Sequence, residues 1–336
     1  MITHPSENIP SEIVETLREQ ALSAEQNKSL TPGQLALIRN QRWFDLFVPE
    51  HRGGLGKNFP EAVRLLEAIA WADGSTGWTV TLCSGAGWFI GFLNPASADK
   101  IFHDPLHCIA GSGKNTGEAR LVQDGYEISG TWSHATGAPY ATVFTFNCMT
   151  DNELRSFWVP RNHVTIRENW DAMGMVATAS HSFELSRVFV PAENSFSIDP
   201  FSVYLDDIIF QFPFQQFAEA TLAANISGMA MRFLELCASS DRPKRILPEA
   251  IKTLQSARNV FYQCVEESWA ELATTRQLSE GRAASLTLSC KELAAVSRSV
   301  VNDIFPLCGL IVAQRTTEVN RVWRNLQTAS LHVLLT

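Results

Sequence analysis

The side chains best suited to chemistry gather in one glycine-rich segment, residues 107–148. Within it, the sequence TWSHAT (131–136) places an indole, an imidazole and hydroxyl groups on a short predicted strand between Gly130 and Gly137. An imidazole titrates near neutral pH, so it can exchange protons under physiological conditions. The run AGSGKNTG (110–117) comes just before it and would let the backbone approach a ligand closely. A flexible loop that leads into a hairpin is the simpler interpretation of this run.

The common phosphate, metal and nucleophile motifs do not fit this sequence. A Walker loop requires glycine where Cys108 stands, Ser or Thr where Asn115 stands, and a helix afterwards. The pattern GxGxxG requires a third glycine where Thr116 stands. The sequence also contains no HExxH, GxSxG or CxxC motif and no histidine pair at helical metal spacing. We therefore expect no nucleoside-triphosphate site, no metal site and no α/β-hydrolase chemistry.

Composition narrows the class of protein further. The 336 residues are enough for about two or three domains, and a hydrophobic content of 45% can form a large core. The formal net charge is −8 without a long basic run, which argues against nucleic acid as a partner. The seven cysteines are scattered, as is typical of buried thiols in a reducing compartment. The polar N-terminus lacks an apolar signal core, and the most apolar window, 78–93, is shorter than the roughly 20 residues that span a membrane. These features predict a cytoplasmic protein without a membrane partner.

The segment that carries the chemical side chains is predicted to be β-structure. Asp124-Gly125 stands between two alternating runs, which is a strong signal for a two-residue hairpin turn. Period-two alternation and β-branched residues predict further strands downstream. The predicted strands are 119–122, 126–128, 131–136, 142–148, 155–160, 163–170 and 182–191.

Helices are predicted on both sides of this β-structure, because apolar residues repeat there at helical spacing. Ser11 is predicted to cap the first helix. The run Asp73–Thr76 is predicted to end the third helix and to separate it from a buried fourth. The predicted helices are 12–24, 32–41, 60–71, 77–93, 95–103, 215–239, 248–274, 282–303 and 317–335.

The order of helices, strands and helices predicts an α+β fold. We expect an N-terminal helical domain over 1–106, a middle β-domain over 107–200 and a C-terminal helical bundle over 201–336. The residues alone lead no further than this fold class and a glycine-rich β-region.

Five segments stand in the order and spacing of one known family: 44–56, 66–78, 125–142, 174–191 and 320–332. In these segments, and in the helices between them, the sequence resembles the acyl-CoA dehydrogenase superfamily. It looks most similar to the branch of two-component flavin-dependent monooxygenases. The resemblance implies a barrel-like middle domain and a C-terminal four-helix bundle that assembles a homotetramer or homodimer. It also implies FAD or FMN, held between the β-domain and the bundle.

The resemblance further implies which residues would contact the flavin. Thr136 falls where the family places a hydroxyl donor toward the edge of the flavin ring, and His134 falls where the dehydrogenases often place tryptophan. The backbone of Gly111, Ser112 and Gly113 falls where the dehydrogenases use a loop that contains Thr-Glu, so this chain departs from the pattern there. Thr136 and His134 could equally be structural residues of a strand.

Other implied site residues lie in the helices. Arg324 would meet cofactor phosphates or a neighbouring subunit, or would lie on a solvated helix face. His332 falls where the monooxygenase branch carries a histidine near the flavin, where it would stabilise or protonate a flavin–oxygen adduct. Trp78, Trp88 and Phe89 would wall a substrate pocket, although core packing is an equally good interpretation of them.

Three functions follow from these features. The preferred one is a monooxygenase, in which reduced flavin from a separate reductase activates oxygen for attack on an aromatic or other small organic substrate. The second is an acyl-CoA dehydrogenase, which needs a carboxylate base. In the family this base comes from the first helix of the bundle or from its last part. The resemblance aligns Ala218 with the position on the first helix, and the neighbouring Glu219 points about 100° away. The third is a non-catalytic homologue that assembles but binds flavin weakly or not at all.

Overall fold

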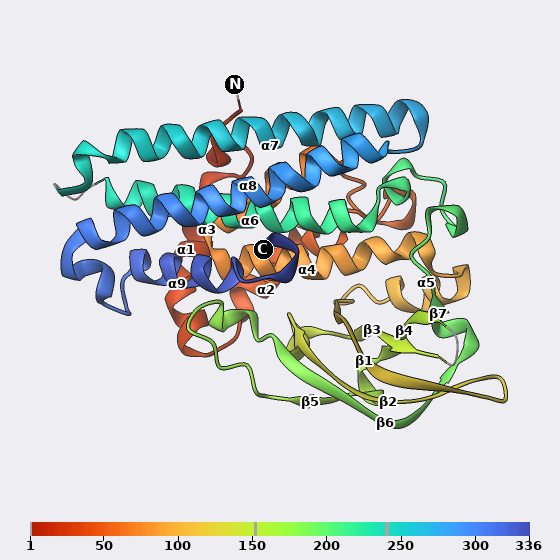
Figure 1. Cartoon of the computed structure of the whole chain (residues 1–336). Helices are drawn as coiled ribbons and strands as arrows, with labels where there is room; N and C mark the ends of the chain where they lie inside the picture. The colour runs from red at the N-terminus through yellow and green to blue at the C-terminus, as the bar shows by residue number, and fades with distance from the viewer. Residues whose placement is uncertain (1, 151–152, 239–241) are drawn as a thin grey trace.

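A computed structural model describes residues 2–150, 153–238 and 242–336. Long helices lie together on one side of the molecule, and a seven-stranded sheet packs below them (Figure 1). The elements follow the chain in the predicted order of helices, strands and helices, so the α+β prediction is confirmed.

The helices before the sheet lie close to the predicted ones, and the structure corrects the predicted cap of the first and the predicted break before the fourth. Ser11 is not an N-cap, because Pro10 takes that position with a non-helical ψ of 142° and Ser11 is the first helical residue. The predicted break at Asp73–Thr76 is only one residue long. The Asp73 carboxylate accepts a hydrogen bond from the Thr76 backbone N–H and so caps the next helix at Gly74. The helices are α1 (Ser11–Gln26), α2 (Pro32–Asn40), α3 (Phe59–Ala72), α4 (Gly74–Gly87) and α5 (Pro95–Phe102).

The sheet has the strand order β5-β6-β2-β1-β3-β4-β7. β1 and β2 form the predicted hairpin, with Asp124 at a left-handed φ of 61° in the turn. TWSHAT is not a separate strand, because β2 continues through Gly130, which pairs with Gly117 beside the Trp132 ring. The strands are β1 (Ile109–Val122), β2 (Gly125–Ala135), β3 (Val143–Met149), β4 (Leu154–Pro160), β5 (Thr165–Arg167), β6 (His181–Pro191) and β7 (Ser195–Phe196).

The helices after the sheet are α6 (Phe214–Cys237), α7 (Leu247–Thr275), α8 (Glu280–Ile304) and α9 (Glu318–Ala329). The predicted end of the first of these at Ser239 lies outside the described residues. The last helix ends before the predicted residue 335, because His332 adopts an extended ψ of 131° and caps a short separate turn, Val333–Leu335. This C-terminal turn packs against α6 and α8.

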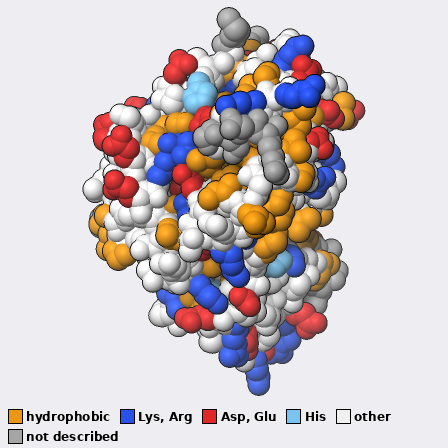
Figure 2. Space-filling view, turned by 90° about the vertical axis from the view of Figure 1, so that its left-hand side faces the viewer, with side chains coloured by type: hydrophobic (Ala, Val, Ile, Leu, Met, Phe, Trp, Pro, Cys, Tyr) orange, Lys and Arg blue, Asp and Glu red, His pale blue; other side chains and the backbone are white. Residues whose placement is uncertain are grey.

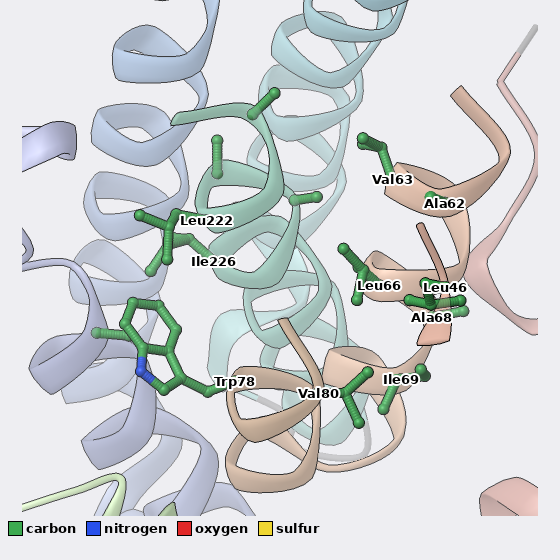
Figure 3. Packing of buried hydrophobic residues seen from close by; sticks show 14 of the residues in the cluster. Leu46, Ala62, Val63, Leu66, Ala68, Ile69, Trp78, Val80, Leu222 and Ile226 are labelled. Carbon is green, nitrogen blue, oxygen red and sulfur yellow. The ribbon is translucent and has the colours of Figure 1, made fainter. Parts of the chain in front are cut away.

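Tight packing joins α3, α4 and α6 in the centre of the core. A Cβ at Gly77 of α4 would lie 2.5 Å from the Ala70 Cα of α3, so these two helices approach closely. Figure 3 shows Trp78 directed from α4 toward Leu222 of α6. The predicted burial of the fourth helix is confirmed. It continues as a 3₁₀ turn, Trp88–Phe92.

Two further observations concern the whole chain. Its cysteines are all free, and all except the half-buried Cys264 are buried, as predicted. One helical stretch, Glu280–Ala313, has a length and composition compatible with crossing a membrane, and 33% of its apolar window is buried. In this structure its main part, α8, packs against α6 and α7.

Candidate functional site

A cavity of about 220 Å³ lies where the sheet meets α4 and α6. Its sheet wall consists of residues 110–113 of β1, residues 145–147 of β3, Thr136 and Ser156. Its helical wall comes from α4, α6 and the C-terminal turn, and from two residues close to β7. We call this space the sheet–helix cavity.

The glycine-rich run 110–117 is a strand with an irregularity, and the predicted flexible loop is wrong. Gly111 pairs with Thr145 of the parallel strand β3, and a Cβ at Gly111 would collide with the Thr145 hydroxyl. Only glycine therefore lets β1 pass this close to β3. The register shifts between Ser112 and Asn115, as in a β-bulge, which bends the strand at the cavity.

Short hydrogen bonds hold the polar groups of this wall in place. The Ser112 hydroxyl donates to the Ser133 carbonyl at 2.8 Å. The Asn147 amide donates to the Gly113 carbonyl at 3.0 Å and accepts from the Ser156 hydroxyl at 2.8 Å. The sheet wall is therefore a fixed array of main-chain, hydroxyl and amide groups.

Thr136 belongs to a buried chain of hydroxyl groups behind the cavity. Its Oγ1 lies 2.8 Å from Ser180 Oγ, which lies 2.7 Å from Thr178 Oγ1. Thr178 donates in turn to the Met175 carbonyl at 2.8 Å. Sequence reasoning found Thr136 but missed Ser180 and Thr178, which the pairing of β2 with β6 brings to it.

His134 does not line the sheet–helix cavity. It lies where the register of β2 on β6 shifts, with a left-handed φ of 67° that is uncommon for a non-glycine residue. Its ring packs edge-on against Trp170. Burial, and then the charge of Lys114, lowers the pKa of His134 below the ordinary 6.5, so the ring is neutral at pH 7.

His332 does line the cavity, from the extended segment after α9. Its Nδ1 accepts a hydrogen bond from the Leu334 backbone N–H at 3.3 Å, so the proton of the neutral ring resides on Nε2. Burial, and then the nearby His134, lowers the pKa of His332 below the ordinary 6.5. The ring is therefore neutral at pH 7 and can donate through Nε2. Trp78 packs edge-on against it, with ring centroids 6.0 Å apart.

Of the three aromatic residues predicted to wall a substrate pocket, Phe89 lines the cavity and two do not. Trp78 packs in the core beside Leu222 (Figure 3). Trp88 is 0% exposed and donates from its indole N–H to the Ile209 carbonyl at 3.1 Å. For Trp78 and Trp88 the structure therefore supports the core-packing interpretation.

A stripe along α6 forms a large part of the helical wall, and sequence reasoning named only Ala218 of it. The stripe follows the spacing i, i+3, i+4, i+7 and i+8 of one helix face, which was the available signal. Its residues are Phe214, Phe217, Ala218, Thr221 and Leu222.

Ala218 and Glu219 point in different directions, as the sequence predicts. Ala218 lines the cavity, whereas Glu219 is 1% exposed and accepts hydrogen bonds from Gln215 at 2.9 Å and Thr287 at 2.5 Å. No carboxylate lines the cavity within the described part of the chain. A dehydrogenase base is therefore missing from this wall.

Arg324 lies away from the cavity, and the predicted solvated face is wrong. Its side chain forms an ion pair with Glu25 of α1 and donates to the Asn320 side chain at 2.7 Å and the Met173 carbonyl at 2.9 Å. With only 5% of the residue exposed, the guanidinium docks α9 onto the rest of the chain. This placement fits a structural role better than contact with cofactor phosphates.

The residues around the cavity fit a flavin ring. Such a ring has hydrogen-bonding atoms along its edge and flat apolar faces. The sheet wall supplies polar groups for the edge, and Phe89, Phe214 and Phe217 supply flat apolar cover on the opposite wall. Within the described residues, no group of three His, Cys, Asp or Glu side chains is suited to hold a metal.

Comparison with known proteins finds relatives whose names describe monooxygenases, among them a flavin-dependent one. Residues 217–336 match the family model of the acyl-CoA dehydrogenase C-terminal domain. The chain is 25% identical to indole-3-acetate monooxygenase of Pseudomonas putida, over 86% of its length and 79% of that protein. It is 22% identical to the flavin-dependent monooxygenase oxygenase subunit HsaA of Mycobacterium tuberculosis, over 94% of its length and 88% of that protein.

Solved structures share the fold along almost the whole chain. The HsaA crystal structure has a TM-score of 0.90 at 20% identity and covers 96% of this chain and 93% of that one. XiaF from Streptomyces, in complex with FADH2 and glycerol, has a TM-score of 0.87 at 17% identity. The match covers 99% of this chain and 91% of the XiaF chain. The resemblance to the acyl-CoA dehydrogenase superfamily, and within it to flavin-dependent monooxygenases, is confirmed.

Proposed function

We propose that this protein is the oxygenase component of a two-component flavin-dependent monooxygenase that acts on a small aromatic substrate. The observation that carries the proposal is the pair of unlike walls in the sheet–helix cavity. Polar groups of β1, β3 and β4, with Thr136 just after β2, face aromatic side chains of α6, and His332 lines the same space. The oxygenase activities of HsaA and indole-3-acetate monooxygenase support this proposal.

The sheet wall would hold the flavin. The backbone of 111–113, together with Ser112 and Thr136, would meet the polar edge of the ring. FAD and FMN share this ring, so either would fit these groups. When bound in its reduced form, the flavin supplies the electrons that activate oxygen. The FADH2 held by XiaF in the same fold supports a reduced flavin here, delivered by a separate reductase.

His332 would orient the reacting groups. Because its Nδ1 is occupied by the Leu334 N–H, its free donor is Nε2–H. A hydrogen bond from Nε2–H would hold a polar oxygen at the cavity wall with the ring uncharged. The low pKa keeps this donor in the same state throughout the neutral pH range.

The helical wall would bind the substrate. Phe89, Phe214 and Phe217 offer flat apolar surfaces, and no Asp, Glu, Lys or Arg lines the cavity among the described residues. Burying an unpaired charge in such a site is costly. The favoured substrate is therefore a small uncharged aromatic compound.

The C-terminal helices would also assemble the protein. Figure 2 shows hydrophobic side chains gathered over the helical part of one face. Leu288, Leu310 and Val333 are 69%, 85% and 77% exposed in the single chain. We propose a cytoplasmic homotetramer or homodimer, with the domain limits 1–106, 107–200 and 201–336, a barrel-like middle domain and a four-helix bundle.

Formation of a hydroxylated product, measured together with oxygen consumption, tests the proposal. The purified protein is mixed with FMN or FAD that a flavin reductase keeps reduced, and small uncharged phenols and indoles are screened as substrates. We expect a hydroxylated product only when protein, reduced flavin and oxygen are all present. Reductase without this protein controls for peroxide formed by free flavin. Peroxide alone across the panel, despite tight flavin binding, would contradict the proposal.

The two other functions give different results in the same preparation. Bleaching of bound oxidised flavin by an acyl-CoA without oxygen would indicate a dehydrogenase. The position of Glu219, which is buried against Thr287 of α8 and directed away from the cavity, disfavours this function. Failure to bind either flavin in either redox state would indicate a non-catalytic homologue.

A further inference from the structure

The hydroxyl chain behind Thr136 has a fixed direction. Each hydroxyl group has a single hydrogen to donate, whereas a carbonyl oxygen can only accept. Thr178 donates its hydrogen to the Met175 carbonyl, so Ser180 must donate to Thr178. Thr136 must then donate to Ser180. The reverse direction would leave the Thr178 and Met175 oxygens facing each other at 2.8 Å without a hydrogen between them.

Because the three hydroxyl groups are buried, water cannot replace their hydrogen bonds to one another and so reverse the direction of donation. Thr136, Thr178 and Ser180 are 4%, 0% and 4% exposed, so bulk water offers them no alternative partners. Hydrogen bonds in such an apolar setting strengthen one another along a chain. Since the hydrogen of Thr136 is held by Ser180, its oxygen has only lone pairs left for a ligand in the cavity that Thr136 lines.

We propose that Ser180 and Thr178 are positioning residues that make Thr136 a hydrogen-bond acceptor, so that the cavity binds reduced flavin in preference to oxidised flavin. This inference rests on the proposed function, because it needs flavin in the sheet–helix cavity. It reverses the role of hydroxyl donor that the family resemblance implies for Thr136.

The chemistry of the flavin ring explains the preference. Oxidised flavin has a bare N5, which can only accept a hydrogen bond. Reduced flavin carries a hydrogen on N5 and can donate one. The inference takes Thr136 Oγ1 to face N5. An acceptor oxygen at N5 binds the reduced ring and repels the oxidised one. A protein that receives reduced flavin and releases the oxidised form gains from this difference at both steps.

Met175, whose carbonyl accepts the last hydrogen bond of the hydroxyl chain, is itself held in place by other hydrogen bonds. The Met175 backbone N–H donates to the Asn325 side chain of α9 at 2.7 Å, and the Met175 carbonyl also accepts from the Trp170 indole at 2.8 Å. The carbonyl that sets the direction is therefore fixed between the sheet and α9.

Binding measurements on the intact protein test the inference. Dissociation constants are measured for oxidised FMN and FAD in air and for the reduced forms under anaerobic conditions. The informative quantity is the ratio of the oxidised to the reduced constant. In Ser180→Ala, Thr136 regains a hydrogen that it can donate to the bare N5, so we expect this ratio to fall by about tenfold, the effect of roughly one hydrogen bond.

Two further variants distinguish an effect on the direction of the hydroxyl hydrogen bonds from a general disturbance of the structure. Ser180→Thr retains the hydroxyl group, so it should keep the wild-type ratio. Ser182→Ala removes a different buried hydroxyl group, two residues further along the sequence. This hydroxyl bonds to Asn169 and is not part of the Thr136–Ser180–Thr178 hydroxyl chain, so the variant should also keep the wild-type ratio. If Ser180→Ala does not fold, Thr136→Val replaces it, and the preference for reduced flavin should be lost.

The outcomes are distinct. A ratio that is the same in wild type and Ser180→Ala, with both forms bound, would overturn this inference and leave the proposed function standing. Absence of binding to either form by the wild-type protein would end the proposed function and the inference together. A lowered ratio in Ser180→Ala, restored in Ser180→Thr, would establish the inference.

Discussion

At the scale of single residues, His332 has the most clearly defined state in the cavity. Its Nδ1 is bonded to the Leu334 N–H and its pKa lies below 6.5, so at neutral pH it is an uncharged donor through Nε2. We expect His332→Ala to lower the rate of product formation by about tenfold, as for the loss of one hydrogen bond. The measurement is product formed under saturating reduced flavin, with the exposed histidine variant His163→Ala as the control.

The same residue predicts a pH dependence. A lowered pKa means that the ring takes up a proton only below pH 6.5, and this proton must displace the Leu334 N–H from Nδ1. Activity should therefore be level on the alkaline side of neutrality and fall toward acid pH, with the midpoint of the fall below pH 6.5. His332→Ala should lack this acid limb. An acid limb above pH 7 in the wild type, or one that persists in the variant, would contradict the assignment.

Only some of the residues around the cavity could be predicted from the sequence. Thr136 and His332 could be singled out because they stand in recognisable segments of the sequence. Ser180 also stands in such a segment, 174–191, but its role could not be predicted, because 44 residues separate it from Thr136 and only the pairing of β2 with β6 brings the two hydroxyl groups together. Arg324 has the same charge whether it meets a phosphate or Glu25, so the ion pair that buries it was not visible in the sequence.

At the scale of elements, the glycines of α4 have different roles at different helix faces. A Cβ at Gly85 would have Phe217 as its nearest neighbour, at an ordinary contact distance of 3.8 Å across the cavity. Because alanine stabilises a helix interior by about 0.5–1 kcal/mol over glycine, Gly85→Ala should fold at least as stably as the wild type. It should nevertheless weaken binding of flavin or substrate, since the methyl group enters the cavity. Thermal unfolding and flavin titration measure the two effects.

Gly77→Ala is the matched comparison on the same helix. Its new methyl group would lie 2.5 Å from the Ala70 Cα, which is backbone and cannot move aside cheaply. We expect this variant to lower the melting temperature, because overpacking of a core costs about 1–3 kcal/mol. Equal stability of the two variants would contradict the close approach of α3 and α4.

The elements themselves could be predicted to within a few residues because periodicity and capping are local. The errors fall where a distant part of the chain decides. The α9 helix ends at Ala329 because His332 turns into the cavity, and 110–117 is a strand because β3 pairs with it. β3 follows 110–117 only after the whole β1–β2 hairpin, and the sheet and α6 residues that line the cavity with His332 come long before α9 in the sequence.

At the scale of the whole molecule, one buried ion pair joins α3, α6 and α7. The Glu67 carboxylate accepts from Arg258 at 2.8 and 2.7 Å, from Tyr262 at 2.7 Å and from Ser227 at 2.5 Å. Glu67 and Arg258 are each 1% exposed. Among the described residues, the side chains that donate to this carboxylate come from α6 and α7, so the network fixes α3 onto the helices that follow the sheet.

Removal of one partner should therefore be far more harmful than removal of both. Glu67→Ala leaves a buried, unpaired guanidinium, and we expect a loss of about 3–5 kcal/mol in the free energy of unfolding. Glu67→Leu combined with Arg258→Met removes both charges and retains much of the volume, so it should be markedly more stable than Glu67→Ala. The exposed Glu61→Ala on the same helix should cost less than about 1 kcal/mol. Denaturant unfolding measures the stability of all three variants. If the double variant is no more stable than Glu67→Ala, the Glu67–Arg258 ion pair supplies net stability instead of only fixing how the helices dock.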